Sequence, residues 1–83
     1  MFTIIKNRPF GEKYFYTIRL DDIVYNGEIA KNIGLSLEQY MDILNQYGTC
    51  KYSIFGFGFE TKKDAQKIVK LLEPHLVMAK LIS

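Results

Sequence analysis

The sequence predicts an α+β fold in which a four-stranded, mostly antiparallel sheet carries a helical pair and a third helix on one face. Runs rich in β-branched and aromatic residues predict the strands, and apolar residues at helical spacing predict the helices. Gly, Pro and helix-capping residues separate these runs. The predicted order is β-β-α-α-β-α-β. Because there is no repeat, linker or low-complexity tract, we expect one domain spanning residues 1–83.

Two strands are predicted at the start of the chain, at residues 2–6 and 13–20. Both segments are rich in β-branched and aromatic residues, and the stretch between them contains Pro9 and Gly11. This pattern favours an antiparallel hairpin. Alternation along the second strand places three residues on one face: Tyr14, Tyr16 and Ile18.

Residues 26–47 have the shape of a helix-turn-helix. Asn26 is the expected N-cap of the first helix, and Gly34 suits a left-handed helix end. Ser36 and Gln39 are spaced as a capping box, which predicts the start of the second helix. The apolar stripes expected to face the core are Ile29, Ala30 and Ile33 in the first helix, and Leu37, Tyr40, Met41 and Leu44 in the second.

The rest of the chain predicts a strand, a helix and a last strand. Residues 50–59 have the pattern of a central strand, and Thr61 is placed to cap the following helix. The residues of that helix expected to face inward are Ala65, Ile68, Val69 and Leu72. We expect Pro74 to end the helix and residues 76–82 to form a strand. As an exposed edge, that strand could pair two copies, so both a monomer and a homodimer are open.

Composition and motifs argue against several classes of protein. The chain has 83 residues, of which 48% are hydrophobic, and Cys50 has no second cysteine to pair with. No apolar run approaches the length of a signal peptide core or a membrane span, so we expect a soluble cytoplasmic protein. His75 is the single histidine. We therefore predict no catalytic residues, no metal site and no cofactor, and expect a protein that is not an enzyme.

Charge is distributed unevenly along the chain. The formal net charge is +2, but residues 20–47 carry −4, because five carboxylates stand against Lys31. The segments on either side, residues 1–19 and 48–83, carry +3 each. The predicted helical pair is therefore acidic within an otherwise basic protein, which bears on partner choice.

The exposed side of the second predicted helix is acidic. Glu38, Asp42 and Asn45 recur at i, i+4 and i+7, which places them together on the helix surface. A DNA reader neutralises phosphates with basic side chains, and carboxylates oppose this. We therefore predict a protein-binding face of Glu38, Asp42 and Asn45. The alternatives are a DNA-reading helix, in which Gln39 or Asn45 contacts adenine, and a helical pair with a purely structural role.

The third predicted helix carries a basic stripe. Lys63, Lys67 and Lys70 also follow i, i+4 and i+7 spacing. Such a stripe can bind phosphates or an acidic protein surface, and it is equally typical of the solvated side of an amphipathic helix. We keep these lysines as candidate partner-binding residues.

The run Gly56-Phe57-Gly58-Phe59 before a helix resembles part of the RNA-recognition motif, in which strand aromatics stack on bases. The resemblance covers about twenty residues, and it departs in register and topology. If it held, Phe55, Phe57 and Phe59 would share an exposed face. The competing interpretation is a core strand whose glycines allow another element to cross closely.

The chain as a whole is similar to small proteins encoded by phages and prophages of anaerobic, low-GC bacteria. Three segments carry this resemblance: residues 7–11, 34–40 and 72–81. Compact phage proteins of this size include anti-CRISPR proteins. The resemblance implies a non-enzymatic inhibitor that occludes a host protein or ribonucleoprotein defence complex. The alternative is a small helix-turn-helix-like, DNA-binding regulator of a mobile element.

Overall fold

The structure is a computed structural model that describes residues 1–7, 14–47, 50–53 and 56–82; of residues 7, 50–53 and 56–57 it describes the backbone alone. The predicted loop at residues 7–12 is wrong at Asn7, which is the last residue of the first strand. Residues 8–12 of that loop lie outside the described residues, and so does Gly48, the glycine expected to end the second helix. The elements are β1 (Phe2–Asn7), β2 (Phe15–Leu20), α1 (Asn26–Asn32), α2 (Leu37–Leu44), the 3₁₀ turn η1 (Asn45–Tyr47), β3 (Cys50–Ser53), β4 (Gly56–Phe59) and α3 (Lys62–Ile82).

The strands form a four-stranded sheet of order β1-β2-β4-β3, in which each neighbouring pair is antiparallel. In the β1–β2 ladder Phe2 lies opposite Leu20, and Ile4 lies opposite Ile18. Phe2, Ile18 and Leu20 are buried, which identifies the face of the sheet that packs against the helices. Phe59 of β4 is opposite Tyr16 and is also buried, so the same face continues into the centre of the sheet.

The opposite face of the sheet is only partly buried at Ile5, Phe15 and Thr17. On this face Phe15 lies across Gly58, where a Cβ atom would approach the Phe15 Cβ to 2.9 Å. Only glycine fits under the aromatic side chain at this position. The close neighbour is a residue of the adjacent strand β2, which pairs with β4, so the interpretation of a strand crossed by another element stays a prediction.

The helical pair is close to its prediction, except that Leu37, which was expected to face the core, is 52% exposed. Gly34 adopts a left-handed φ of 75° between α1 and α2. Ser36 Oγ accepts a hydrogen bond from the Gln39 backbone N–H at 3.1 Å, and the Ser36 N–H donates to Gln39 Oε1 at 3.0 Å. This is the predicted capping box. The predicted cap of α1 is wrong by one residue, because Tyr25 is the N-cap, without a side-chain hydrogen bond, and Asn26 is already helical.

The longest helix, α3, packs one side into the core. Its buried residues are Ala65, Ile68 and Leu72, as predicted, and they join Tyr40 and Leu44 of α2 in a single cluster with the sheet. Thr61 Oγ1 accepts a hydrogen bond from the Asp64 N–H at 3.1 Å, which caps the helix start as predicted.

Two predictions about the later part of the chain are wrong. Residues 76–82 are not a strand, because α3 continues through Pro74 to Ile82. Proline removes one helical hydrogen bond but does not forbid a helix, and Leu76 beyond it still packs against the core. The single strand predicted at residues 50–59 is divided into β3 and β4, which pair with each other. The α+β class is confirmed, whereas the predicted element order is not.

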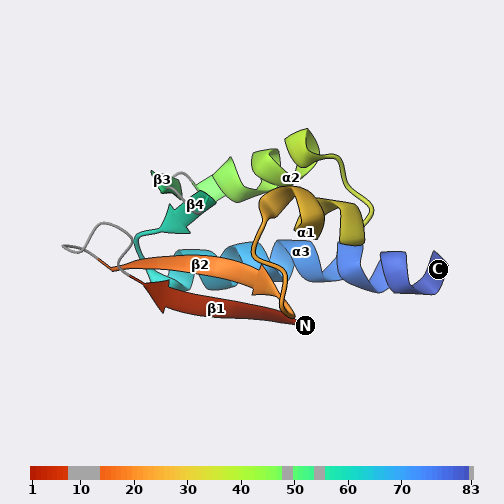
Figure 1. The fold of residues 1–83 in the computed structure, drawn as a ribbon, viewed down its shortest axis with the longest axis horizontal. Coiled ribbons are helices and arrows are strands. Elements are labelled where there is room, and N and C mark those ends of the chain that lie inside the picture. Colours follow the sequence, from red (N-terminus) through yellow and green to blue (C-terminus); the bar gives the residue numbers. More distant parts are fainter. Residues whose placement is uncertain (8–13, 48–49, 54–55, 83) are drawn as a thin grey trace.

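Figure 1 shows α3 running the length of the molecule, with the β1–β2 hairpin on one side and α1 and α2 on the other. The last turns of α3 extend beyond the other elements (Figure 1). The molecule is elongated, with principal extents of 42 × 22 × 20 Å. No helix in the described parts of the chain combines the length and the apolar character needed to cross a membrane.

Candidate protein-binding face

The candidate face lies on the outer side of α2. Tyr40 and Leu44 are buried on the inner side of this helix. Glu38, Asp42 and Asn45 fall on the opposite side at helical spacing, and all three are exposed. We call these three residues the α2 outer face. The structure therefore brings together on one surface the residues that the sequence predicts to act together.

Local structure holds this face in place. The capping box at Ser36 fixes the start of α2 and satisfies backbone donors there. Glu38 lies in the first helical turn, where a negative charge interacts favourably with the helix dipole. Asn45 is the C-cap of α2, with φ −86° and ψ −3°. The face is a rigid helical surface whose acidic end is also the electrostatically favoured end of the helix.

The basic stripe lies on the exposed side of α3. Lys63, Lys67 and Lys70 are all exposed, opposite the buried side chains of Ala65 and Ile68. The Lys67 ammonium lies 5.3 Å from the centroid of the Tyr47 ring in η1. This distance is within the range of a cation–π interaction. Lys67 therefore leans toward the segment that follows α2.

The acidic and basic candidates are on neighbouring helices. Helix α2 packs against α3, and Tyr40, Leu44 and Ile68 belong to the same buried cluster. The Lys67–Tyr47 contact is made two residues beyond Asn45. Lys67 is therefore close to the segment that follows the α2 outer face, whereas Lys70 lines a separate groove.

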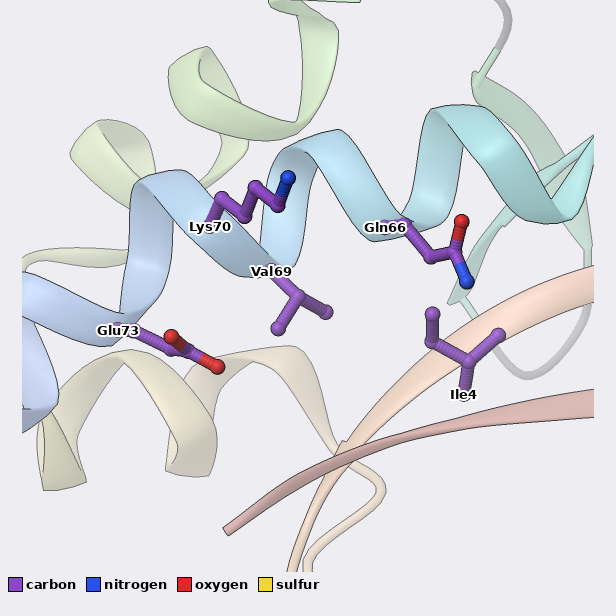
Figure 2. A pocket seen from close by; sticks show the side chains of 5 residues that line it. All are labelled: Ile4, Gln66, Val69, Lys70 and Glu73. Atoms are coloured by element: carbon purple, nitrogen blue, oxygen red, sulfur yellow. The ribbon is translucent and has the colours of Figure 1, made fainter.

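That groove lies between α3 and β1. It is shallow and open, has a volume of about 400 Å³, and is lined by Ile4, Gln66, Val69, Lys70 and Glu73. Figure 2 shows the polar ends of Gln66, Lys70 and Glu73 around the apolar side chains of Ile4 and Val69. The groove combines an amide, an ammonium and a carboxylate at its rim, and sequence reasoning did not single it out as a site.

Two further features became visible only in the structure. Lys6 Nζ lies 4.4 Å from the Tyr14 ring centroid and 6.0 Å from that of Tyr16, so the β1–β2 hairpin carries a cation over two aromatic rings. Asp21 Oδ1 accepts a hydrogen bond from the Met1 ammonium at 2.6 Å. This hydrogen bond and the positive charge of the ammonium lower the pKa of Asp21, and Lys80 adds a smaller effect in the same direction.

One of the three Phe residues that would stack on RNA bases is not accessible in the structure. Phe59 is 1% exposed and belongs to the core, so it cannot stack on a base. Phe55 and the side chain of Phe57 lie outside the described residues.

Among the side chains described, there is no group of three His, Cys, Asp or Glu residues arranged to hold a metal ion. No family model, curated protein or solved structure matches this chain.

Proposed function

We propose that this protein is a non-enzymatic binding protein that acts through the α2 outer face on a basic surface of a partner. The single observation that carries the proposal is the exposure of Glu38, Asp42 and Asn45 on one side of a capped helix. Opposite charges across an interface raise the association rate and select the partner. The acidic α2 outer face fits a partner with a basic surface.

The most specific form of this proposal is a phage-type inhibitor of a host nucleic-acid-handling defence complex, with an anti-CRISPR-like role. Complexes that handle nucleic acid bind phosphates through basic channels. An acidic helical face that enters such a channel excludes the nucleic acid by occlusion, and no chemical step is required. This form of the proposal places the protein in the cytoplasm of the bacterial cell.

A charge-reversal experiment tests the α2 outer face. In the double variant Glu38→Lys/Asp42→Lys we expect affinity for the effector complex to fall by about tenfold or more, mainly through slower association. The control variant Asp22→Lys/Glu28→Lys makes the same change in net charge at exposed residues outside the face. It also matches the loss of a first-turn carboxylate, because Glu28 lies in the first turn of α1.

The measurement is surface-immobilised binding to effector complexes purified from a bacterial host, with inhibition of target-DNA cleavage as a second readout. Equal losses in both double variants would mean that net charge, and not this face, controls binding. Undiminished binding and inhibition by Glu38→Lys/Asp42→Lys would remove the α2 outer face from the proposal.

The alternative function is DNA binding by the helical pair, and one observation favours it. Gly34 and the Ser36 capping box join α1 and α2 by a tight turn, and a helix-turn-helix uses such a turn to hold its second helix for the major groove. This alternative predicts binding to promoter DNA that weakens steeply between about 50 mM and about 200 mM salt. A gel-shift titration at the two salt concentrations separates the two functions.

A further inference from the structure

Strand β1 is an edge of the sheet. The order β1-β2-β4-β3 places no strand on its outer side among the residues that the structure describes. Its ladder with β2 runs from Phe2 to Asn7 without a bulge. The strand has no proline, and its single charged residue is Lys6. Edge strands are usually protected by bulges, prolines or several charges, because a regular edge pairs readily with another strand. This edge is therefore open to strand pairing.

The ladder shows which backbone groups of β1 point outward. In an antiparallel pair, residues that exchange backbone hydrogen bonds alternate with residues that do not. The Asp21 N–H donates to the Met1 carbonyl at 3.0 Å, and these two residues are opposite each other in the register of the β1–β2 ladder. The alternation then directs the N–H and C=O groups of three residues away from β2: Phe2, Ile4 and Lys6. We call these three residues the free edge of β1.

The groove between α3 and β1 lies beside the free edge. Alternate residues of a strand share a face, and the burial of Phe2 shows that this face is the one toward the helices. Ile4 lines the groove, and in Figure 2 the Gln66 and Val69 side chains point toward it. A strand paired with β1 puts the side chain opposite Ile4 on the same face. That side chain would enter the groove and contact Ile4 and Val69.

The charges at the two ends of the groove have opposite signs. Helix α3 runs antiparallel to β1 (Figure 1), so Glu73 lies toward the start of β1, whereas Lys6 lies near its end. A strand added antiparallel to β1 runs from the Lys6 end to the Phe2 end. An acidic residue two positions before the groove residue would face Lys6, and a basic residue two positions after it would approach Glu73. Charge complementarity selects the order acidic-x-apolar-x-basic.

We propose that the free edge of β1 and the adjoining groove bind an extended peptide segment of a partner protein, by antiparallel strand addition, with the pattern acidic-x-apolar-x-basic. In this mode of recognition, backbone hydrogen bonds provide affinity and pockets for alternate side chains provide specificity. A second copy of β1 is a poorer occupant. Pairing centred on Ile4 would set Lys6 of each copy opposite Phe2 of the other, and β1 has no carboxylate to meet it. The surface is separate from the α2 outer face, so the proposal does not depend on the proposed function.

Hydrogen exchange of the protein without peptide tests the free edge. We expect the amides of Ile4 and Lys6 to exchange at least about tenfold faster than those of Thr3 and Ile5, whose N–H groups point to β2. The measurement is made by NMR at a low and a high protein concentration. Protection of Ile4 and Lys6 at both concentrations would overturn the proposal, because the edge would already be covered. Protection at the high concentration alone would assign the edge to a second copy and would overturn it too.

A synthetic peptide tests the pattern and its direction. The probe is acetyl-Thr-Glu-Thr-Leu-Thr-Arg-Thr-amide, in which threonine favours the extended conformation. In an NMR titration we expect saturable binding, with the largest amide shifts at the free edge of β1. A control peptide with Glu and Arg exchanged has the same composition and should bind about three- to tenfold more weakly. Equal binding of the two peptides, or binding of neither up to about 1 mM, would overturn the proposal.

Backbone methylation of the peptide separates strand addition from contact through side chains alone. Alternate peptide N–H groups point to β1, so the Leu N–H would donate to the Ile4 carbonyl and the N–H of the following Thr would point away. Methylation of the Leu nitrogen should weaken binding by about tenfold or more, whereas methylation of that Thr nitrogen should change it less than about twofold. Equal losses from the two methylations would overturn strand addition.

Charge reversal in the protein tests the groove. Glu73→Lys should weaken binding of the probe about three- to tenfold, and a peptide with Glu in place of Arg should bind this variant better than it binds the wild type. The control Glu28→Lys makes the same change in net charge at an exposed residue of α1 that does not line the groove. It should bind the probe as the wild type does, and circular dichroism verifies that both variants are folded. Equal losses in the two variants would overturn the proposal, because net charge and not the groove would then control binding.

Discussion

The two halves of α3 differ in the chemistry of the same exposed side. Up to Lys70 that side is basic, and from Val77 onward it is apolar. The first half is an ordinary amphipathic helix, because its inner side is fully buried at Ala65 and Ile68. The second half has an apolar outer side as well, where solvent would favour polar residues. The first half of α3 therefore stabilises the fold through its buried side, whereas the outer side of the second half is apolar without being packed in the fold.

The largest expected effect is the difference in unfolding free energy between a substitution in the first half of α3 and one in the second half. Ile68→Ala removes a side chain with 0% exposure and should lower the free energy of unfolding by about 2–5 kcal/mol. Leu81→Ala truncates a side chain that is 76% exposed and should change it by less than about 0.5 kcal/mol. Urea unfolding at low micromolar concentration provides both values. A loss of similar size in Leu81→Ala would mean that the second half is folded into the monomer core.

Pro74 marks the boundary between the halves and supplies the second prediction. Its ring removes the hydrogen bond that the carbonyl of Lys70 would otherwise accept, and it crowds the preceding turn. Pro74→Ala should therefore raise the free energy of unfolding by about 1–3 kcal/mol. Hydrogen exchange should show the gain as slower exchange of the amides of residues 76–82. Destabilisation by Pro74→Ala would instead mean that the proline helps to seat Leu76 on the core.

This boundary is also where prediction from the sequence failed. Residues 76–82 contain Leu, Met, Ala and Lys, which favour helices, yet the local rule that proline ends a helix predicts a helix end at Pro74. Whether a helix crosses a proline depends on packing beyond it, here at Leu76, and local rules do not contain that information. The sequence does not predict the division of residues 50–59 into β3 and β4, for a related reason. An apolar, aromatic run without a clear turn signal predicts one strand as readily as two.

The helical pair could be predicted well because its signals are local. The Ser36–Gln39 capping box and the left-handed Gly34 follow from residues within a few positions of each other. The same holds for the α2 outer face, since helical spacing alone places Glu38, Asp42 and Asn45 together. Spacing could not reveal that Lys67 approaches Tyr47 or that Lys80 acts on Asp21. Those contacts depend on how α3 packs in three dimensions.

The smallest expected effect concerns Asp21, whose charge interacts with the second half of α3 through Lys80. The hydrogen bond from the Met1 ammonium lowers the pKa of Asp21 first, and Coulombic attraction to the same group and to Lys80 adds to it. A carboxyl whose pKa is lower in the folded state stabilises the fold above its unfolded pKa of about 3.9. That contribution disappears as the pH falls through the folded pKa. It is small, because the Met1 ammonium and Asp21 are 88% and 71% exposed.

The test compares the wild type with Asp21→Asn as a function of pH. Asparagine tolerates the positive φ of 51° at this position, so the substitution removes the charge without straining the turn. The difference in unfolding free energy between the two proteins should be constant from about pH 5 to pH 7 and should vanish below the folded pKa. Acetylation of the Met1 amine should reduce the same difference at neutral pH. A difference that persists in acid would show that Asp21 acts through the turn backbone and not through its charge, and it would remove this link between the start of the chain and the second half of α3.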